Sequence, residues 1–250
     1  MVISSALALE QLAMTLPLVL ASLLLGLALK PLLAWRMLRT EVQAVEQALQ
    51  QSLPAGRERL SWLVSRDVSA LSEAGVRESA IESLAENLND SVVAPLFWFV
   101  MLGLPGAALY RFANTADAMW GYRGVYRGQR WEWAGKWAAR VDDGLSWLPA
   151  RLTAALLLLA AGLRGLRLAG ALPSEAGKTP SPNSGWPMAA MALVLGVALR
   201  KPQVYWLNPG GRKAQAADTG HAVAYAEKTL LLLIAVAVLA MVYVAAWGVP

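Results

Sequence analysis

The sequence predicts an all-α fold, that of a polytopic helical integral membrane protein with kinked or re-entrant helices. Of its 250 residues, 57% are hydrophobic and only 16% are charged, and the mean hydropathy is +0.44. Soluble domains are less apolar and carry about 25% charged residues. Five apolar runs also alternate with polar segments, as expected when helices of about 20 residues enter a bilayer in succession.

The five apolar runs differ in how well they fit a straight membrane crossing. They cover residues 12–33, 92–109, 145–166, 187–199 and 229–247. The first and last are long enough, the third is long enough if its helix begins near Trp147, and the fourth is short. The second run contains Pro95 and the segment GLPG at 103–106, which favour a kinked or re-entrant element.

The distribution of basic residues predicts the orientation of the first run. Arg36 and Arg39 follow it closely, whereas no Lys or Arg precedes Lys30. By the positive-inside rule, the Arg36 side faces the cytoplasm. The run lacks a basic leader and a small-residue cleavage site, so we expect a retained anchor. The net charge of +5 comes with no basic tract interleaved with aromatics, so we expect no nucleic-acid partner.

Polar segments divide what we expect to be a single membrane domain over residues 1–250. Residues 36–91 are predicted to form a cytoplasmic helical region, with a helix starting near Ser72. Residues 110–145 form a polar region that carries a site, and residues 173–186, rich in Pro, Ser and Gly, form a loop.

The residue types limit the chemistry of any site. The chain has no cysteine and a single histidine, His221, which excludes disulfides, thiolate catalysis and a histidine metal cluster. A metal would need oxygen ligands, which suits Mg²⁺. No Gly-rich nucleotide-binding motif is present, so a nucleotide would occupy a non-standard site.

An acidic stripe is the first candidate site. Glu78, Glu82, Glu86 and Asp90 are spaced four residues apart, so they lie along one helix face. Like charges at this spacing destabilise a bare helix unless solvent, a basic partner or a cation offsets the repulsion. A solvated outer face is the alternative, although Asn87 and Asp90 immediately before an apolar run favour a site.

The next helix carries the second candidate site, because Tyr110, Asn114 and Asp117 share one face. An aspartate on a largely apolar helix needs a partner. Three arginines that follow are candidates: Arg123, Arg127 and Arg130. A structural ion pair that fixes helix packing is the alternative, and the arginines could equally contact phosphate, anionic lipid or simply set topology.

The third candidate site lies at the start of the third apolar run. Arg140, Asp143 and Arg151 share a helix face, and Asp142 lies beside them. An adjacent aspartate pair can bind Mg²⁺ together with substrate phosphates. A charged helix start with an internal salt bridge is the alternative.

A turn sequence, SPNSGW at 181–186, precedes the fourth run. Asn183 or Ser184 could cap the helix that follows, and the amino terminus of that helix would then suit an anion. Capping without a ligand is the alternative.

Taken together, these blocks resemble the adenosylcobinamide-phosphate synthase family of cobalamin biosynthesis, the CbiB/CobD type. The resemblance covers about residues 36–196. It rests on Arg66-Asp67, AIESLAEN at 80–87, Asp90, VVAPLF at 92–97, NTADAMWGYR at 114–123, Tyr126, ARVDD at 139–143, WLPARLT at 147–153, SPNSGW at 181–186 and AAMA at 189–192.

The resemblance implies a multi-pass enzyme of the bacterial cytoplasmic (inner) membrane. It would be a carbon–nitrogen ligase that uses ATP to join adenosylcobyric acid to aminopropanol phosphate, with membrane lipid as its surroundings and homo-oligomerisation left open. The carboxylate would be activated as an acyl phosphate before the amine displaces phosphate, with Mg²⁺ and arginines neutralising the transferred group.

The resemblance also implies residue roles. The catalytic candidates are Glu82, Glu86, Asp117 and Asp143, and the metal candidates are Asp90 and Asp142. The substrate-binding candidates are Arg66, Asn87, Asn114, Tyr122, Arg123, Arg140, Arg151 and Asn183.

Some positions depart from that family's pattern. Ser91 stands where glycine is usual, Gly124 replaces an asparagine, and the usual amino-terminal Asp-Pro and His-Pro pairs are absent. The segments FWFV at 97–100 and GAALYR at 106–111 also resemble membrane proteins of the AmpE type, which are linked to β-lactamase induction. A non-catalytic membrane sensor or accessory protein is therefore the alternative function.

Overall fold

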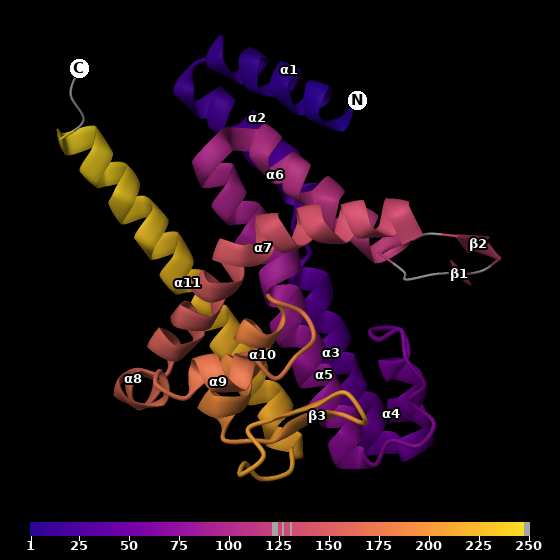
Figure 1. The fold of residues 1–250 in the computed structure, drawn as a ribbon. Helices are drawn as coiled ribbons and strands as arrows, with labels where there is room; N and C mark the ends of the chain where they lie inside the picture. The colour runs from indigo at the N-terminus through magenta and orange to yellow at the C-terminus, as the bar shows by residue number, and fades with distance from the viewer. Residues whose placement is uncertain (122–124, 127, 131, 248–250) are drawn as a thin grey trace. The chain divides into compact units, whose positions relative to one another are not determined.

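The computed structural model describes residues 1–121, 125–126, 128–130 and 132–247, and these residues are overwhelmingly helical (Figure 1). The predicted all-α class is confirmed. The strands described form two short antiparallel hairpins, β1 (Val125–Tyr126) with β2 (Gln129–Arg130) and β3 (Leu199–Lys201) with β4 (Tyr205–Leu207). The chain divides into two compact units, which we describe separately.

Unit 1 comprises Met1–Trp35 and Asn89–Pro149. Its helical elements are α1 (Val2–Met14), α2 (Leu18–Leu29), the 3-10 turn η1 (Lys30–Leu32), the π-helical turn η2 (Asn89–Val93), α6 (Ala94–Trp120) and the first part of α7 (Glu132–Ala160). Ala6 of α1 packs against Leu104 and Ala108 of α6, with partly buried side chains of α2 around them. The apolar runs at the amino terminus thus form a small core with α6.

The kink predicted in the second apolar run is present in α6. Helical geometry is interrupted at Leu102 and Gly103, just before Pro105, and Gly103 has a φ of 66°. Figure 1 shows α6 bending sharply next to α1. Proline removes a backbone donor and glycine allows the left-handed conformation, so the local sequence accounts for the break.

The prediction of one continuous anchor over residues 12–33 is wrong. A turn separates α1 from α2, and Pro17 occupies the N-cap position of α2 with extended backbone angles. The Thr15 hydroxyl donates to the carbonyl oxygen of Leu12 at 2.8 Å. Proline cannot donate a backbone hydrogen bond to the preceding turn, so the apolar run divides where Pro17 stands.

Unit 2 comprises Arg36–Leu88 and Ala150–Pro250. Its helices are α3 (Trp35–Gln51), α4 (Leu53–Leu60), α5 (Glu73–Leu88), the second part of α7, α8 (Leu163–Leu168), α9 (Leu172–Ala176), α10 (Gly185–Leu195) and α11 (Ala216–Trp247). The short helix α9 lies at the start of the segment 173–186. As predicted, a helix starts near Ser72: α5 begins at Glu73, and the Ser72 hydroxyl accepts the Gly75 N–H at 3.2 Å.

The helix α5 occupies the interior of unit 2. It packs against α4, α10, α11 and β3, and most of its side chains from Val76 to Leu88 are buried. The side chains of α10 from Pro187 to Leu195 are buried as well. Charged groups on the buried face of α5, such as Glu78 and Glu82, therefore lie where water is scarce.

Three helical stretches among the described residues are long and apolar enough to cross a membrane: Leu18–Gln51, Glu73–Trp120 and Ala216–Tyr243. On α11, Leu231, Leu239 and Tyr243 are each more than 60% exposed. Such a row of exposed apolar side chains on a long helix matches a lipid-facing surface. The fold is therefore that of a helical membrane protein.

We predict that Gly103→Ala destabilises unit 1. An added Cβ would collide with the carboxylate of Glu10, and the residue would keep a left-handed φ. Such backbone strain costs about 1–3 kcal/mol, so the midpoint of thermal unfolding in detergent should fall. Gly26→Ala in α2 is the control, because nothing lies within 4 Å of a Cβ there. Equal midpoints for the two variants would contradict the assignment of strain to Gly103.

Candidate functional site

The acidic stripe of α5 is partly buried in unit 2. Glu78 is 1% exposed and Glu82 is 4% exposed, so the alternative of a solvated outer face does not apply to these two carboxylates. Burying a carboxylate costs several kcal/mol unless charged or hydrogen-bonding partners compensate. The partners of Glu78 and Glu82 therefore decide what the stripe can do.

Arginines from two other segments reach these carboxylates. The Nη2 atom of Arg66 donates to Oε2 of Glu82 at 2.9 Å and to the Ser79 hydroxyl at 2.6 Å. The Nε atom of Arg200, in β3, lies 3.4 Å from Oε2 of Glu78. We call Arg66, Glu78, Glu82, Arg200 and Tyr205 the Glu82 cluster.

The Glu82 cluster is incompletely satisfied. Among the residues that the structure describes, two of its buried atoms, Glu82 Oε1 and Arg66 Nε, have no hydrogen-bond partner, and Glu78 Oε2 has only the 3.4 Å ion pair with Arg200. Buried polar atoms in folded proteins are nearly always paired. An open donor, an open acceptor and a loosely paired carboxylate oxygen in one cluster suit a bound polar ligand or ordered water.

Within the Glu82 cluster, Tyr205 lies close enough to both Glu82 and Glu86 to be affected by their charges. Burial raises the pKa of the Tyr205 phenol, and the negative charges of Glu82 and Glu86 raise it further. The phenol is therefore held neutral, and its hydroxyl donates to the weakly accepting sulfur of Met188 at 3.7 Å. Asn87, in contrast, is used locally, since its amide donates to the carbonyl oxygen of Ser83 at 2.9 Å.

A second polar cluster lies in unit 1. The Nη1 atom of Arg111 donates to the carbonyl oxygen of Asp90 at 3.1 Å and to the side-chain oxygen of Asn114 at 3.2 Å. The amide of Asn114 in turn donates to Oδ1 of Asp142 at 3.3 Å. We call Asp90, Arg111, Asn114 and Asp142 the Asp142 cluster. Next to Arg111 on α6, the hydroxyl of the buried Tyr110 hydrogen-bonds the Ser146 hydroxyl at 3.0 Å.

Negative charge is in excess around Asp142, which lies in the polar first half of α7. Burial raises the pKa of Asp142 to about 7, and repulsion from Asp90 and Asp117 adds to this effect. The hydrogen bond from Asn114 lowers the pKa, and Asp143 raises it slightly. A cation beside Asp142 would offset the repulsion.

These residues could hold Mg²⁺ only together with other ligands, such as substrate phosphates and water. Among the described residues, no group of three or more Asp, Glu or His side chains is arranged to hold a metal ion. Mg²⁺ is often bound by one or two carboxylates, with substrate phosphates and waters completing its shell. Asp142 with Asp90 is compatible with that arrangement, so both stay predicted metal residues.

The remaining predicted site residues are distributed as follows. Arg140 is exposed on α7, whereas Arg151 lies with its Nη1 atom 3.4 Å from the Asn183 side-chain oxygen and its guanidinium 4.6 Å from the Trp186 ring centre. Tyr122 and Arg123 lie outside the described residues.

One local prediction changed. Ser184 is at the N-cap position of α10 but makes no side-chain cap hydrogen bond. Instead, the Ser181 hydroxyl accepts the backbone N–H groups of Asn183 and Ser184, each at 3.2 Å. The predicted pairing of Asp117 with Arg123, Arg127 or Arg130 stays a prediction, because these arginine side chains lie outside the described part of the structure.

The sequence analysis missed Arg111, Arg200 and Tyr205. Arg111 has a usable signal, since an arginine three residues before Asn114 lies on the same helix face. Arg200 and Tyr205 lie on the hairpin β3–β4, whose strands are only three residues long. Strands this short are hard to recognise from alternation in the sequence.

The fold is that of a helical membrane protein in which two clusters of charged and polar side chains gather among the helices. The chain matches the family described as CobD/Cbib protein over residues 1–234, and it belongs to that family.

Several curated relatives support the assignment. The probable cobalamin biosynthesis protein CobD of Methanothermobacter thermautotrophicus is 44% identical over 186 residues, covering 73% of this chain and 61% of the relative. The cobalamin biosynthesis protein CobD of Brucella melitensis is 42% identical over 217 residues, covering 81% and 65%. That of Rhodobacter capsulatus is 39% identical over 214 residues, covering 82% and 67%.

The chain spans less than two thirds of the length of the first two of these relatives. No solved structure matches the chain.

We predict that Asp142→Asn changes the pH dependence of stability. Folding raises the pKa of Asp142 from 3.8 to about 7. At pH values between these two, Asp142 is protonated in the folded chain but ionised in the unfolded chain. Stability therefore falls as the pH rises through this range. The substitution should remove the fall and raise the unfolding midpoint near pH 8, by roughly 2–4 °C for each kcal/mol of repulsion relieved.

Glu132→Gln is the control for Asp142→Asn, because Glu132 is an exposed carboxylate on the same helix. Thermal unfolding of both variants and the unmodified chain would be followed from pH 5 to about pH 8. An unchanged pH profile in Asp142→Asn would show that Asp142 does not carry the excess charge.

Proposed function

We propose that this chain acts in cobalamin biosynthesis as an ATP-dependent carbon–nitrogen ligase that joins adenosylcobyric acid to aminopropanol phosphate. Family membership over residues 1–234 carries the proposal, together with relatives named cobalamin biosynthesis proteins at 39–44% identity. The reaction takes place at the cytoplasmic side of the bacterial inner membrane, where ATP is available, and the chain crosses that membrane several times.

The two ionic clusters support this chemistry. The carboxylate of adenosylcobyric acid attacks the γ-phosphoryl group of ATP, and ADP leaves with the bridging oxygen. The amine of aminopropanol phosphate then attacks the acyl carbon, inorganic phosphate leaves, and a carboxylate takes the proton from the amine. Every reactant carries negative charge, so the site must supply cations and hydrogen-bond donors.

Arg66 and Arg151 would bind the anionic groups of the reactants. The Nε atom of Arg66 has no partner among the described residues, so its guanidinium retains a donor beyond the bond to Glu82. Guanidinium groups match phosphate oxygens in two-point contacts. Asn114, Asn183 and the neutral Tyr205 hydroxyl would orient the polar atoms of the reactants.

The carboxylates divide between two roles. Asp90 and Asp142 would hold Mg²⁺, which supplies charge neutralisation to the phosphates when bound. Glu82, Glu86, Asp117 and Asp143 are the candidates for taking the amine proton. Asp142 is assigned to the metal rather than to proton transfer because the charge of Asp90 lies close enough to raise its pKa, and a cation between the two would offset that repulsion.

The proposed activity is tested with the purified chain in detergent. The reaction contains ATP, Mg²⁺, adenosylcobyric acid and aminopropanol phosphate, and chromatography separates the corrinoid products. We expect one amide product for each ATP converted to ADP. Absence of the amide from a chain that circular dichroism shows to be folded would contradict the proposal and favour a non-catalytic accessory protein of the AmpE type.

We further expect Asp143→Asn to lower the rate of amide formation by about 10²–10⁴, the usual contribution of a general base. Glu132→Gln removes an exposed carboxylate from the same helix and should leave the rate unchanged. If Asp143→Asn retains full turnover, Asp143 is not the base. Equal losses in both variants would point to a general effect of charge on α7.

A further inference from the structure

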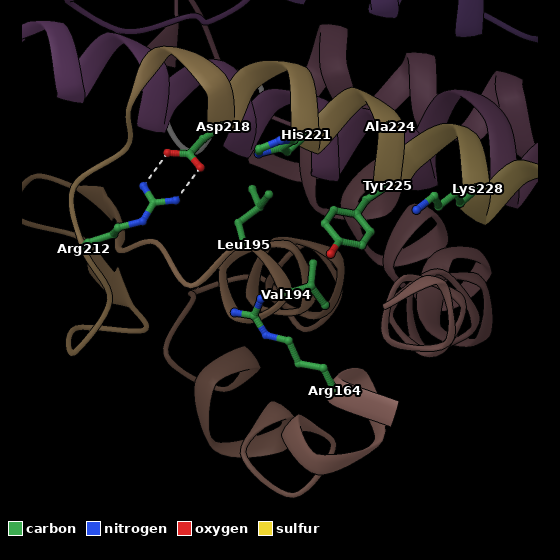
Figure 2. A pocket seen from close by; sticks show the side chains of 9 residues that line it. All are labelled: Arg164, Val194, Leu195, Arg212, Asp218, His221, Ala224, Tyr225 and Lys228. Carbon is green, nitrogen blue, oxygen red and sulfur yellow. Dashed lines mark hydrogen bonds and ion pairs between the residues drawn. The ribbon is translucent and has the colours of Figure 1, made fainter. Parts of the chain in front are cut away.

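A polar pocket lies in unit 2, and it shares no residue with the predicted site. It has a volume of about 360 Å³ and lies between α8, the end of α10 and the first turns of α11. Its charged and aromatic lining consists of Arg164, Arg212, Asp218, His221, Tyr225 and Lys228. Figure 2 shows the side chains of α11 along one wall, with Arg164 reaching in from α8 on the other.

The single carboxylate of this pocket is already neutralised. Both oxygens of Asp218 accept hydrogen bonds from the Arg212 guanidinium at 2.6 Å, and one also accepts the Gln215 N–H at 2.7 Å. The Asp218 side chain is only 2% exposed. This pair fixes the start of α11 and leaves the rest of the pocket without a balancing negative charge.

Two cations in the pocket remain available. Among the described residues, no carboxylate forms an ion pair with Arg164 or Lys228, and both side chains are exposed. Lys228 lies 5.6 Å from the ring centre of Tyr225. Arg164 lies against Gly196, where a Cβ would come within 3.2 Å of its Nη2 atom. The missing side chain at Gly196 thus makes room for the guanidinium.

The pocket is at the polar end of a candidate membrane-crossing helix. The residues of α11 that line it precede the apolar run that begins at residue 229. One turn beyond Lys228, Leu231 is 67% exposed, and beside Arg164, Leu163 is 76% exposed. Cationic groups next to exposed apolar groups reproduce the arrangement that a phosphate at the membrane surface requires.

We infer that this pocket binds a phosphate group through Arg164 and Lys228, with the Tyr225 hydroxyl as an additional donor. The pocket is large enough to hold a phosphate ester rather than an isolated ion. A phospholipid headgroup and a soluble phosphate ester share this chemistry. The site is separate from the proposed ligase site, so the inference does not depend on the proposed function.

The test uses the full chain in a neutral detergent. Phosphatidylglycerol in mixed micelles, soluble glycerol 3-phosphate and, as a zwitterionic control, phosphatidylcholine are titrated separately. Native mass spectrometry counts retained lipid, and the unfolding midpoint reports the soluble ester. Arg164→Gln and Lys228→Gln are compared with Arg167→Gln, an exposed arginine on the same short helix that does not line the pocket.

We expect Arg164→Gln and Lys228→Gln each to weaken binding of one probe by about tenfold or more, since each removes a charge-assisted hydrogen bond. Arg167→Gln should bind as the unmodified chain does. Loss confined to phosphatidylglycerol identifies a lipid headgroup, and loss confined to glycerol 3-phosphate identifies a soluble ester. If neither probe binds, or if all three variants bind equally, the inference is overturned.

Discussion

The fold of unit 2 depends on how the buried charges of α5 are compensated. Arg77 of α5 donates through Nε and Nη2 to the two carboxylate oxygens of Glu46 in α3, at 2.9 and 3.0 Å. The Thr219 hydroxyl of α11 lies 3.3 Å from the same carboxylate. This paired group links three helices, and removing one partner would leave a buried charge at a cost of about 3–5 kcal/mol.

The Glu82 cluster on the same helix is compensated differently. Glu46 has partners on both oxygens, whereas among the described residues Glu82 keeps an oxygen without a hydrogen bond and Glu78 has only the 3.4 Å ion pair with Arg200. Breaking a complete buried ion pair is strongly destabilising, whereas an incompletely paired group keeps the capacity to bind a ligand. One helix therefore combines a structural ion pair with a cluster suited to a ligand, and the rigid helix keeps that cluster in place.

The sequence predicted those parts of the fold that depend on neighbouring residues. The break in α6 follows from Gly103 and Pro105, and the start of α5 follows from Ser72. The contact between Asn114 and Asp142 agrees with their placement in one predicted polar region. The apolar run 12–33 is not one continuous helix, because Pro17 interrupts it and the candidate membrane-crossing stretch begins at Leu18.

Contacts between distant segments were beyond the sequence. The pairing of Arg200 with Glu78, and the position of Tyr205 near Glu82, depend on a short hairpin that tertiary packing places beside α5. The pocket at the start of α11 likewise draws residues from three helices. No periodicity within a single segment carries that information.

The buried charges of the Glu82 cluster are proposed to serve the reactants rather than stability, and Glu78→Gln tests this most directly. Glu73→Gln is the control, because that carboxylate lies on the same helix and is 62% exposed. Both the unfolding midpoint and the rate of amide formation are measured. The account predicts an equal or higher midpoint for Glu78→Gln, since an amide is cheaper to bury, with at least about a tenfold lower rate. A lower midpoint with full activity per folded molecule would contradict it.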